Sequence, residues 1–432
     1  MHIDPPRDPP VDARWVGFRR LTPVGEALRR FLEVGGFGPV GVEEVPWDES
    51  YGRVLASDVI SDVDVPGFHR AAMDGYAVRA EDTFGATPET PRKLRVVGRV
   101  AVGERPNFSI KPGEAAELAT GSALPEGANA VLRVEYAKPV GGYILVYQAV
   151  PPWRDVNRAG CDVRRGEVAL RRGRVLRAQD VGMLALIGRR SVQVYRRPRV
   201  GVLAVGSELV DAFTPVEVGT VVDVDRPMIE LLIRDCGGLP VDYGIVGDDA
   251  SEVGRRLGEA LESCDMAVST GGVSVGKADL VVDALRMLGA RIVVHGVASR
   301  PGSPVALSIL NGKPIISLPG PPAATLIAFH LFARPVIRRL AGVRTEVWPC
   351  VRARLSARVP SKLGYRDYVR VRLVVRDGVV LAEPLRVTGS GILSTMTEAH
   401  GFIEVPEDRE GLEEGEEVQV HLFSPHEPIG VA

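Results

Sequence analysis

The 432-residue sequence has few cysteines, few histidines and almost no net charge. Its four cysteines show no metal-knuckle spacing, so we expect reduced, buried or inert thiols and no zinc site at Cys161, Cys236, Cys264 and Cys350. The seven histidines form no HxxxH or HExxH pattern, which argues against a zinc hydrolase. A formal net charge of −2 argues against nucleic acid as a partner.

Long apolar runs are lacking too. No stretch approaches the roughly 18 apolar residues that a membrane span needs, so we expect no membrane partner. The first residues, MHIDPPRDPPVDARW, are polar and proline-rich and lack the charged start and apolar core of a signal peptide. We therefore expect a cytoplasmic protein. Asparagine and glutamine are scarce, which suits a thermophile.

The chain is too long for one core, and its patterning changes along its length. The stretch with short β-type runs between Gly and Pro predicts a small β-domain inserted into a helical segment. We predict four regions: a discontinuous N-terminal linker domain (15–60 and 153–193), an inserted β-domain (61–152), an α/β domain (194–342) and a C-terminal β-domain (343–432).

Local signals predict several elements. In LTPVGEALRRFLEVGG, Thr22 is a plausible N-cap, with Pro23 in the first helical position and glycines at the end. GVEEVPWDESYGRVLASDVI predicts a strand followed by a short helix, and a further helix is predicted to start near Ala178. A hairpin is predicted around Asp377-Gly378.

Between residues 194 and 342, apolar strands alternate with amphipathic helices. The predicted strands are RVGVLAVG, PVDYGIVG, DMAVST, RIVVHGV and KPIISLPG. Such alternation with Val- and Ile-rich strands is typical of a doubly wound, mostly parallel α/β sheet with both faces covered by helices.

Ligands of an open parallel sheet bind beyond the carboxyl ends of its strands. In this sequence, those positions carry acids and glycines: Glu208, Asp223, Asp225, Asp248 with Asp249, Thr270 to Gly276 with Gly271 and Gly272, Asp279, and Leu318 to Pro322. Adjacent glycines let backbone amides approach a phosphate. Carboxylates beside a phosphate make sense when Mg²⁺ lies between them, so we predict a phosphate and Mg²⁺ site.

Each of these motifs has an ordinary structural alternative. Thr270-Gly271-Gly272 could be a simple turn, and Asp248-Asp249 could cap the next helix. Glu208 could be a solvated acid of a first helical turn. In the β-domain, VPGFHRAAMDGYAVRAED and LATGSALPEGANAV could be a hairpin turn and an Ω-loop, or a surface that docks on a partner.

Six long stretches resemble the molybdopterin molybdotransferases, the family of MoeA and the gephyrin E domain. They are DVPGFHRAAMDGYAVRAEDT, ATGSALPEGANAV, STGGVSVGKADL, SLPGPPAATL, GYRDYVRVRL and GSGILSTMTEAHGFIEVPE, in family order from about Leu21 onward. The resemblance implies insertion of molybdate into adenylylated molybdopterin with release of AMP. It also implies a divalent cation, usually Mg²⁺, four domains, and a homodimer whose active site is shared between subunits.

The resemblance assigns roles position by position. It implies that Glu208, Asp248 and Asp279 bind metal and substrate, and that Asp74 and Thr120 reach the partner's site. Arg300 matches a basic loop and would neutralise phosphate charge while Mg²⁺ polarises the phosphoanhydride. The matching pterin- and phosphate-binding positions are Gly271, Gly272, Ser274, Gly276, Pro301, Asp223, Asp225, Pro319 and Gly320.

Several positions depart from the family pattern. Arg300 and Ser303 stand where the family has lysines, and Val168 stands where it has an acid. Pro321, Asp225 and His400 replace asparagines. These changes leave molybdate and tungstate open as the oxyanion. Two alternatives remain, a molybdopterin adenylyltransferase and a gephyrin-like peptide-binding scaffold; the inserted and C-terminal β-domains favour insertion over the former.

Overall fold

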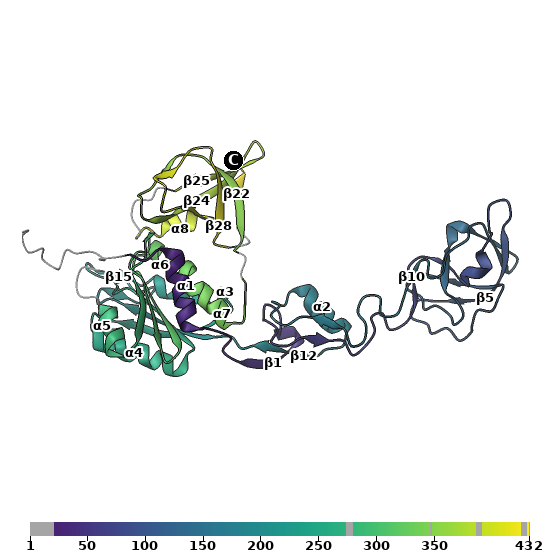
Figure 1. The fold of residues 1–432 in the computed structure, drawn as a ribbon, viewed down its shortest axis with the longest axis horizontal. Helices are drawn as coiled ribbons and strands as arrows, with labels where there is room; N and C mark the ends of the chain where they lie inside the picture. The colour runs from purple at the N-terminus through teal and green to yellow at the C-terminus, as the bar shows by residue number, and fades with distance from the viewer. Residues whose placement is uncertain (1–20, 274–279, 346–347, 386–390, 425–429, 432) are drawn as a thin grey trace, which may run out of the picture. The chain divides into compact units, whose positions relative to one another are not determined.

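The computed structural model describes residues 21–273, 280–345, 348–385, 391–424 and 430–431. The chain divides into two compact units, each with its own cores (Figure 1). One unit comprises Met1–Glu43 with Tyr195–Ala432, and the other comprises Glu44–Val194. No helix in the described ranges is both long enough and apolar enough to cross a membrane.

The first unit is built on a six-stranded sheet of order β16-β13-β17-β21-β20-β18. Its strands are β13 (Arg199–Val205), β16 (Leu239–Val246), β17 (Met266–Thr270), β18 (Arg291–His295), β20 (Ala306–Leu310) and β21 (Lys313–Leu318). The pairings among β16, β13, β17 and β21 are parallel, as predicted.

Strand β20 was missed by the sequence prediction, and it runs antiparallel to both β18 and β21. Leu310 pairs with Lys313 across a two-residue turn made by Asn311 and Gly312. Both turn residues have positive φ, 51° and 76°, which is the conformation that an Asn-Gly hairpin turn requires. The Asn-Gly pair was therefore the available signal for this strand.

Helices cover both faces of this sheet (Figure 1). Residues of α1 (Val24–Gly35), α3 (Asp225–Asp235), the π-helical segment η5 (Phe329–Ala333) and α7 (Arg334–Leu340) form a core with one face. Residues of α4 (Ala250–Ser263) and α5 (Leu280–Met287) form a separate core with the other face. A doubly wound α/β arrangement results, as predicted.

The start of α1 differs from the prediction. Pro23, and not Thr22, is the residue that precedes the first helical position. The backbone of Thr22 instead forms a parallel bridge with Val297, and its N–H donates to the carbonyl of Gly296 at 3.1 Å. Because this pairing holds Thr22 in an extended conformation, the helix begins after Pro23.

The first unit also contains a seven-stranded sheet. Its strands are β19 (Ser299–Arg300), β22 (Cys350–Leu355), β24 (Arg366–Arg376), β25 (Val379–Pro384), β26 (Gly401–Val405), β28 (Glu417–Leu422) and β29 (Gly430–Val431). Outside it, β23 (Val359–Pro360) pairs with β27 (Gly411–Leu412), and α8 is Ser394–Glu398. The predicted hairpin is confirmed, since Asp377 and Gly378 join β24 to β25 with φ of 50° and 74°.

The second unit holds a six-stranded sheet of order β7-β4-β6-β5-β9-β8. The strands are β4 (Gly75–Val78), β5 (Arg92–Val100), β6 (Glu114–Leu118), β7 (Ala130–Arg133), β8 (Ala137–Val140) and β9 (Tyr143–Val146). Strand β4, with β3 (Arg70–Ala71), lies in the stretch that the sequence presented as an unusual loop. β3 pairs with β10 (Val156–Asn157).

A smaller core in the same unit joins β2 (Val59–Ile60), β11 (Val168–Leu170) and α2 (Ala178–Leu186). The predicted helix start at Ala178 is confirmed. The predicted strand is β1 (Val42–Pro46), which pairs with β12 (Ser191–Tyr195). The short helix expected after β1 is a single 3₁₀ turn, Trp47–Glu49. Beyond it, Val54 and Leu55 form isolated β-bridges with Val175 and Val194, and the chain then enters β2.

Candidate functional site

A cavity of about 880 Å³ lies where the strands β13, β17 and β21 end. It is lined by the segments that follow these strands, by the short strands β14 (Leu209–Val210) and β15 (Val221–Val222), and by the start of α3. Gly391 and Leu393 from the C-terminal part of the chain complete the wall. Its place beyond the carboxyl ends of parallel strands is the one expected for a ligand site.

The cavity brings together eight of the predicted site residues: Glu208, Asp223, Asp225, Asp248, Gly271, Gly272, Pro319 and Gly320. Arg300 and Pro301 are not among the lining residues, and Asp74 and Thr120 belong to the other compact unit. Ser274, Gly276 and Asp279 lie outside the described residues. The roles given to all of these residues remain predictions.

The glycines of the cavity permit a close approach of backbone segments. Gly271 has φ of +81°, and a Cβ atom there would lie 2.2 Å from the carbonyl oxygen of Val205. Gly272 has φ of +67°. Gly320 packs against Gly271, since a Cβ on Gly320 would lie 3.5 Å from Cα of Gly271. Only glycine fits Gly271, because both its conformation and the facing carbonyl exclude a side chain.

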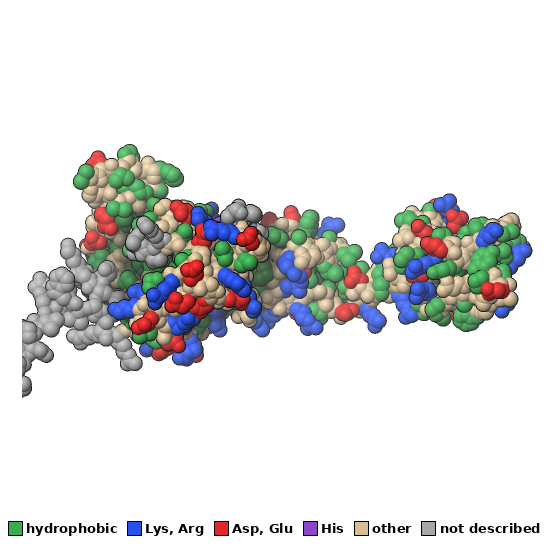
Figure 2. Space-filling model, turned by 90° about the horizontal axis from the view of Figure 1, so that it is seen from above, with side chains coloured by type: hydrophobic (Ala, Val, Ile, Leu, Met, Phe, Trp, Pro, Cys, Tyr) green, Lys and Arg blue, Asp and Glu red, His purple; other side chains and the backbone are tan. Residues whose placement is uncertain are grey.

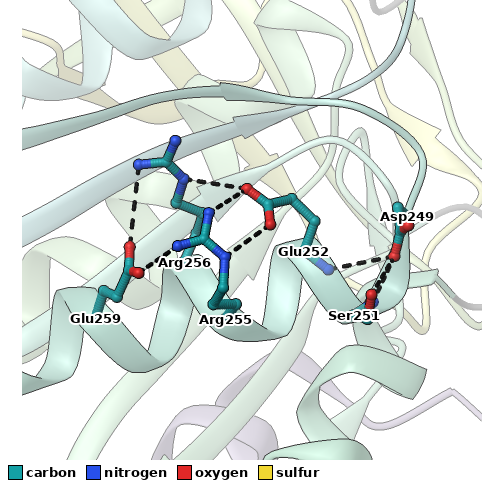
Figure 3. Close-up of polar contacts among 6 residues, drawn as sticks. All are labelled: Asp249, Ser251, Glu252, Arg255, Arg256 and Glu259. Atoms are coloured by element: carbon teal, nitrogen blue, oxygen red, sulfur yellow. Dashed lines mark hydrogen bonds and ion pairs between the residues drawn. The ribbon is translucent and has the colours of Figure 1, made fainter.

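Two carboxylates on the cavity wall have no partner among the described residues. Glu208 and Asp248 are exposed, and in the described part of the chain their carboxylate oxygens make no ion pair or hydrogen bond. The neighbouring Asp249 instead caps α4, because its Oδ1 accepts from the backbone N–H of Ser251 at 2.8 Å (Figure 3). Capping thus explains Asp249 and leaves Asp248 available. Glu208 lies in the turn before β14 and not in a helix.

The described residues contain no group of three or more His, Cys, Asp or Glu side chains that could hold a metal ion. Two free carboxylates on one wall nevertheless fit Mg²⁺ in donor chemistry, because this ion is commonly held by one or two carboxylates, substrate phosphates and water. The other two acids of the wall, Asp223 and Asp225, have partners within the protein.

Asp223 is paired with a cation. The backbone N–H and the Nε of Arg226 donate to its two oxygens at 3.1 and 3.0 Å. The same guanidinium donates from Nη1 to Asp242 at 2.7 Å and from Nη2 to Asp211. Since Asp223 and Arg226 are both buried, this cluster fixes the start of α3 against β15 and β16.

Asp225 is the most deeply buried acid in the cavity wall after Asp223, with a relative exposure of 5%. Its Oδ2 lies within hydrogen-bond distance of the hydroxyl oxygens of Thr270 and Thr325, both at 3.0 Å, while its Oδ1 has no hydrogen-bond partner in the described structure. Burial raises the pKa of Asp225 to about 7, against the lowering effect of the two threonine hydroxyls.

Arg300 is engaged away from the cavity wall. Its Nε donates to Oδ1 of Asp367 at 2.7 Å and its Nη2 donates to Oδ2, in a two-point ion pair between the adjacent strands β19 and β24. The ring of Tyr365 lies 5.4 Å from the guanidinium carbon. The charge that the sequence assigned to phosphate is therefore neutralised within the protein in this structure.

A second arginine, Arg370, was missed by the sequence analysis and, unlike Arg300, has no carboxylate partner among the described residues. Arg370 on β24 is only 2% exposed, and its Nε has no hydrogen-bond partner among the described residues. Its Nη1 lies 3.7 Å from the Met396 sulfur. Burial lowers the pKa of its guanidinium. Met396 packs in one apolar cluster with Leu393, a cavity residue. In the sequence, Arg370 and Arg372 alternate with apolar residues in YVRVRL, so the pattern alone does not indicate that Arg370 is buried.

In the second unit, Asp74 and Thr120 are held together. The backbone N–H and the hydroxyl of Thr120 donate to Oδ1 of Asp74 at 2.6 and 2.8 Å. These two hydrogen bonds lower the pKa of Asp74, so this carboxylate is ionised at neutral pH. The pairing of these two predicted residues across 46 positions of sequence is a finding of the structure.

The fold and the cavity define a protein with an α/β ligand-binding domain of the molybdopterin-binding type. Residues 201–339 match the family model described as "Probable molybdopterin binding domain". Residues 22–188 match "MoeA N-terminal region (domain I and II)", and residues 352–423 match "MoeA C-terminal region (domain IV)".

Relatives agree over nearly the whole chain. "Molybdopterin molybdenumtransferase 2" of Mycobacterium tuberculosis is 33% identical over 87% of this chain and 94% of its own length. "Molybdopterin molybdenumtransferase" of Bacillus subtilis is 31% identical over 94% of this chain and 95% of its own length. The crystal structure of a molybdopterin biosynthesis MoeA protein from Pyrococcus horikoshii is 35% identical, covers 94% of this chain and 100% of its own, and has a TM-score of 0.79. The chain belongs to the MoeA family, which confirms the resemblance.

Proposed function

We propose that this chain is a molybdopterin molybdenumtransferase, which inserts molybdate or tungstate into adenylylated molybdopterin and releases AMP. The observation that carries the proposal is the cavity, whose wall joins the tight Gly271-Gly272 turn with two carboxylates, Glu208 and Asp248, that have no partner among the described residues. The names of the relatives favour this transfer over an adenylyltransferase or a peptide-binding scaffold.

Glu208 and Asp248 are the residues that would hold Mg²⁺. A cation bound there would polarise the phosphoanhydride between pterin and AMP and offset its charge. The protein's own part would be to offer backbone amides of the cavity wall, at Gly272 and Gly320, to the ligand's phosphate. The N–H of Gly271 already donates to the carbonyl of Leu318 at 3.2 Å. Asp223 takes no part in cation binding, because Arg226 already satisfies its charge.

The oxyanion needs a cation, and neither Arg300 nor Arg370 is among the residues that line the cavity. We assign the role to Arg370 in place of Arg300, because Arg370 has no counter-ion among the described residues. An unpaired guanidinium that is 98% buried is costly unless an anion binds to it. Arg300 has Asp367 as its counter-ion, so it contributes little net charge. With Arg370 in this role, oxyanion binding would not require the lysines that the resembling family has at positions 300 and 303.

Asp74 and Thr120 are proposed to act in the partner subunit's cavity within a homodimer. The support is their paired geometry at an exposed surface position together with the family resemblance. A mixed dimer of Asp74→Asn and Asp248→Asn subunits tests this, because one of its two sites would then be intact. Activity restored on mixing two inactive homodimers supports a shared site, and no restoration after verified subunit exchange contradicts it.

AMP release from adenylylated molybdopterin tests the function as a whole. We expect release that requires Mg²⁺, is abolished by EDTA, and depends on an oxyanion. Parallel reactions with molybdate, tungstate and no oxyanion identify the preferred one, and Arg370→Met should weaken that dependence more than Arg300→Met does. Release that is equal with and without oxyanion, or absent from a folded protein, would refute the proposal.

A further inference from the structure

Four oxygen atoms form a closed ring at the wall of the cavity. They are Oδ2 of Asp225, the hydroxyl oxygens of Thr270 and Thr325, and the carbonyl oxygen of Pro319. Each threonine hydroxyl lies 3.0 Å from Asp225, and they lie 2.9 Å (Thr270) and 2.6 Å (Thr325) from the Pro319 carbonyl. All four contacts are within hydrogen-bond distance, and each contact needs one proton.

The number of protons in this ring depends on Asp225. With an ionised carboxylate, only the two threonine hydroxyls supply protons, so two of the four short oxygen–oxygen contacts have none. A proton on Oδ2 of Asp225 raises the number to three. Both hydroxyls can then donate to the Pro319 carbonyl, and Asp225 can donate to one of the threonines. The geometry of the ring therefore favours a neutral Asp225.

The other oxygen of this carboxyl supports the same state. Oδ1 of Asp225 is buried and has no hydrogen-bond partner in the described structure. A buried, unpartnered oxygen costs much less free energy as the carbonyl of a neutral acid than as part of a carboxylate. Asp225 stands where the resembling family has asparagine, and a neutral carboxyl imitates that amide, with one donor and one acceptor oxygen.

The charges around Asp225 do not compensate its ionisation. On its own element and just before it, the single cation Arg226 is shared by Asp223, Asp242 and Asp211, so this cluster offers Asp225 no net positive charge. The segments that contact it from the sheet and from α6 (Pro322–Ala328), which are Met266–Val273 and Pro319–Ala328, contain no charged side chain. Among the described residues, the remaining ionisable groups of the cavity wall are Glu208 and Asp248, both acids. Burial raises the pKa of Asp225 to about 7 in agreement with this setting.

We propose that Asp225 carries a proton in the resting cavity and acts as a proton-linked affinity determinant, so that the cavity accepts an anionic pterin phosphate only while this carboxyl is neutral. Ionisation would place a buried negative charge in a wall that already holds Glu208 and Asp248. The phosphate-bearing ligand would then be repelled at low dielectric, where a charge acts strongly. This inference rests on the proposed function for the identity of the ligand.

The test compares the wild-type protein with Asp225→Asn, which is neutral at every pH. Binding of molybdopterin is measured by calorimetry from about pH 6 to about pH 9, in buffers of different ionisation enthalpy. Above the pKa of Asp225, wild-type affinity should fall by about tenfold per pH unit relative to the variant, and wild type should take up close to one proton more on binding. Titration of the ligand itself cancels in this comparison.

Asp235→Asn at the exposed end of the same helix is the matched control, and it should follow the wild-type pH profile. Thr325→Val removes one hydroxyl from the ring and should shift the pH at which affinity falls. Identical pH profiles for wild type and Asp225→Asn would overturn the proton linkage and leave the proposed function intact. If neither protein binds molybdopterin at any pH, the proposed function fails, and the linkage fails with it.

The protonation state has a separate readout that needs no ligand. An infrared difference spectrum of wild type minus Asp225→Asn should contain the carbonyl band of a protonated carboxylic acid at about pH 6 and lose it at about pH 9. A carboxylate band throughout that range would refute the neutral resting state whatever the binding experiments show. Thermal unfolding of both proteins confirms that the variant is folded.

Discussion

The Nε of Arg226 lies 3.0 Å from Oδ2 of Asp223, and both side chains are buried beside the cavity. Arg226→Met would leave Asp223 as a buried carboxylate without its cation. Such a loss typically costs about 3–5 kcal/mol in the free energy of unfolding. Urea denaturation measures this cost. Arg234→Met, an exposed arginine on the same helix, should change stability by less than about 0.5 kcal/mol, and equal losses for the two variants would contradict the pairing.

Adjacent aspartates offer a test of the cation site. Asp248→Asn removes a free carboxylate from the cavity wall and should lower the rate of AMP release by roughly a hundredfold. Asp249→Asn removes the same charge one residue away, but asparagine caps helices as well as aspartate does, so stability and activity should stay near wild type (Figure 3). The measurement is the initial rate of AMP release at saturating Mg²⁺ for the Asp248→Asn and Asp249→Asn variants. Similar losses in both variants would mean that only the net charge of the region matters.

Two glycines separate steric exclusion from backbone strain. Gly271→Ala would add a Cβ that lies 2.2 Å from the Val205 carbonyl oxygen at φ of +81°, whereas Gly289 has φ of +74° and no atom within 4 Å of the corresponding position. Gly289→Ala should therefore cost only the strain of about 1–2 kcal/mol. Gly271→Ala should cost several kcal/mol more and weaken molybdopterin binding. Chemical denaturation of both variants measures these losses of stability. A larger loss for Gly289→Ala than for Gly271→Ala would contradict the packing of Gly271 against Val205.

His330 gives a prediction about acid stability. It is fully buried among aromatic rings, including Trp348 at 5.1 Å and Phe423 at 5.6 Å between centroids. Burial and the charge of Arg334 lower its pKa to about 3. Because the unfolded chain binds the proton more readily, stability is retained above about pH 6.5 and is lost as the pH falls toward 3.

His330→Phe removes this proton linkage. Wild type should lose about 2 kcal/mol between pH 8 and pH 5 through this residue alone, and the variant should lose correspondingly less. Urea titrations at the two pH values provide the measurement. If wild type and His330→Phe lose the same stability between pH 8 and pH 5, His330 is not buried in a neutral form.

Charge on the surface follows the sequence composition. Figure 2 shows acidic and basic side chains interspersed on the face that it draws, with no continuous field of one sign. The basic groups that concern the proposed chemistry are single buried or paired arginines, Arg226, Arg300 and Arg370.

Much of the fold follows from local sequence. The apolar strands of the α/β domain, the helix beginning at Ala178 and the Asp377-Gly378 hairpin are each specified by a periodicity or by a turn residue within a short window. The edge of the sheet that carries the cavity is also predictable, because the carboxyl ends of parallel strands meet at one edge. Strand β20 escaped prediction only because the Asn311-Gly312 turn was not recognised as a hairpin.

The sequence by itself determined most of the secondary-structure order of the α/β domain, apart from β20, and also the ligand-bearing edge and the family motifs. Only the tertiary structure decided which charged side chains are free. Asp248 and Asp249 are adjacent and identical in type, and Arg300 and Arg370 are both strand arginines. Their states differ because their partners and their burial come from remote segments, such as Asp367 for Arg300 and Thr270 and Thr325 for Asp225. A charge's free energy depends on its desolvation and its partners, and these arise only when distant parts of the chain pack together.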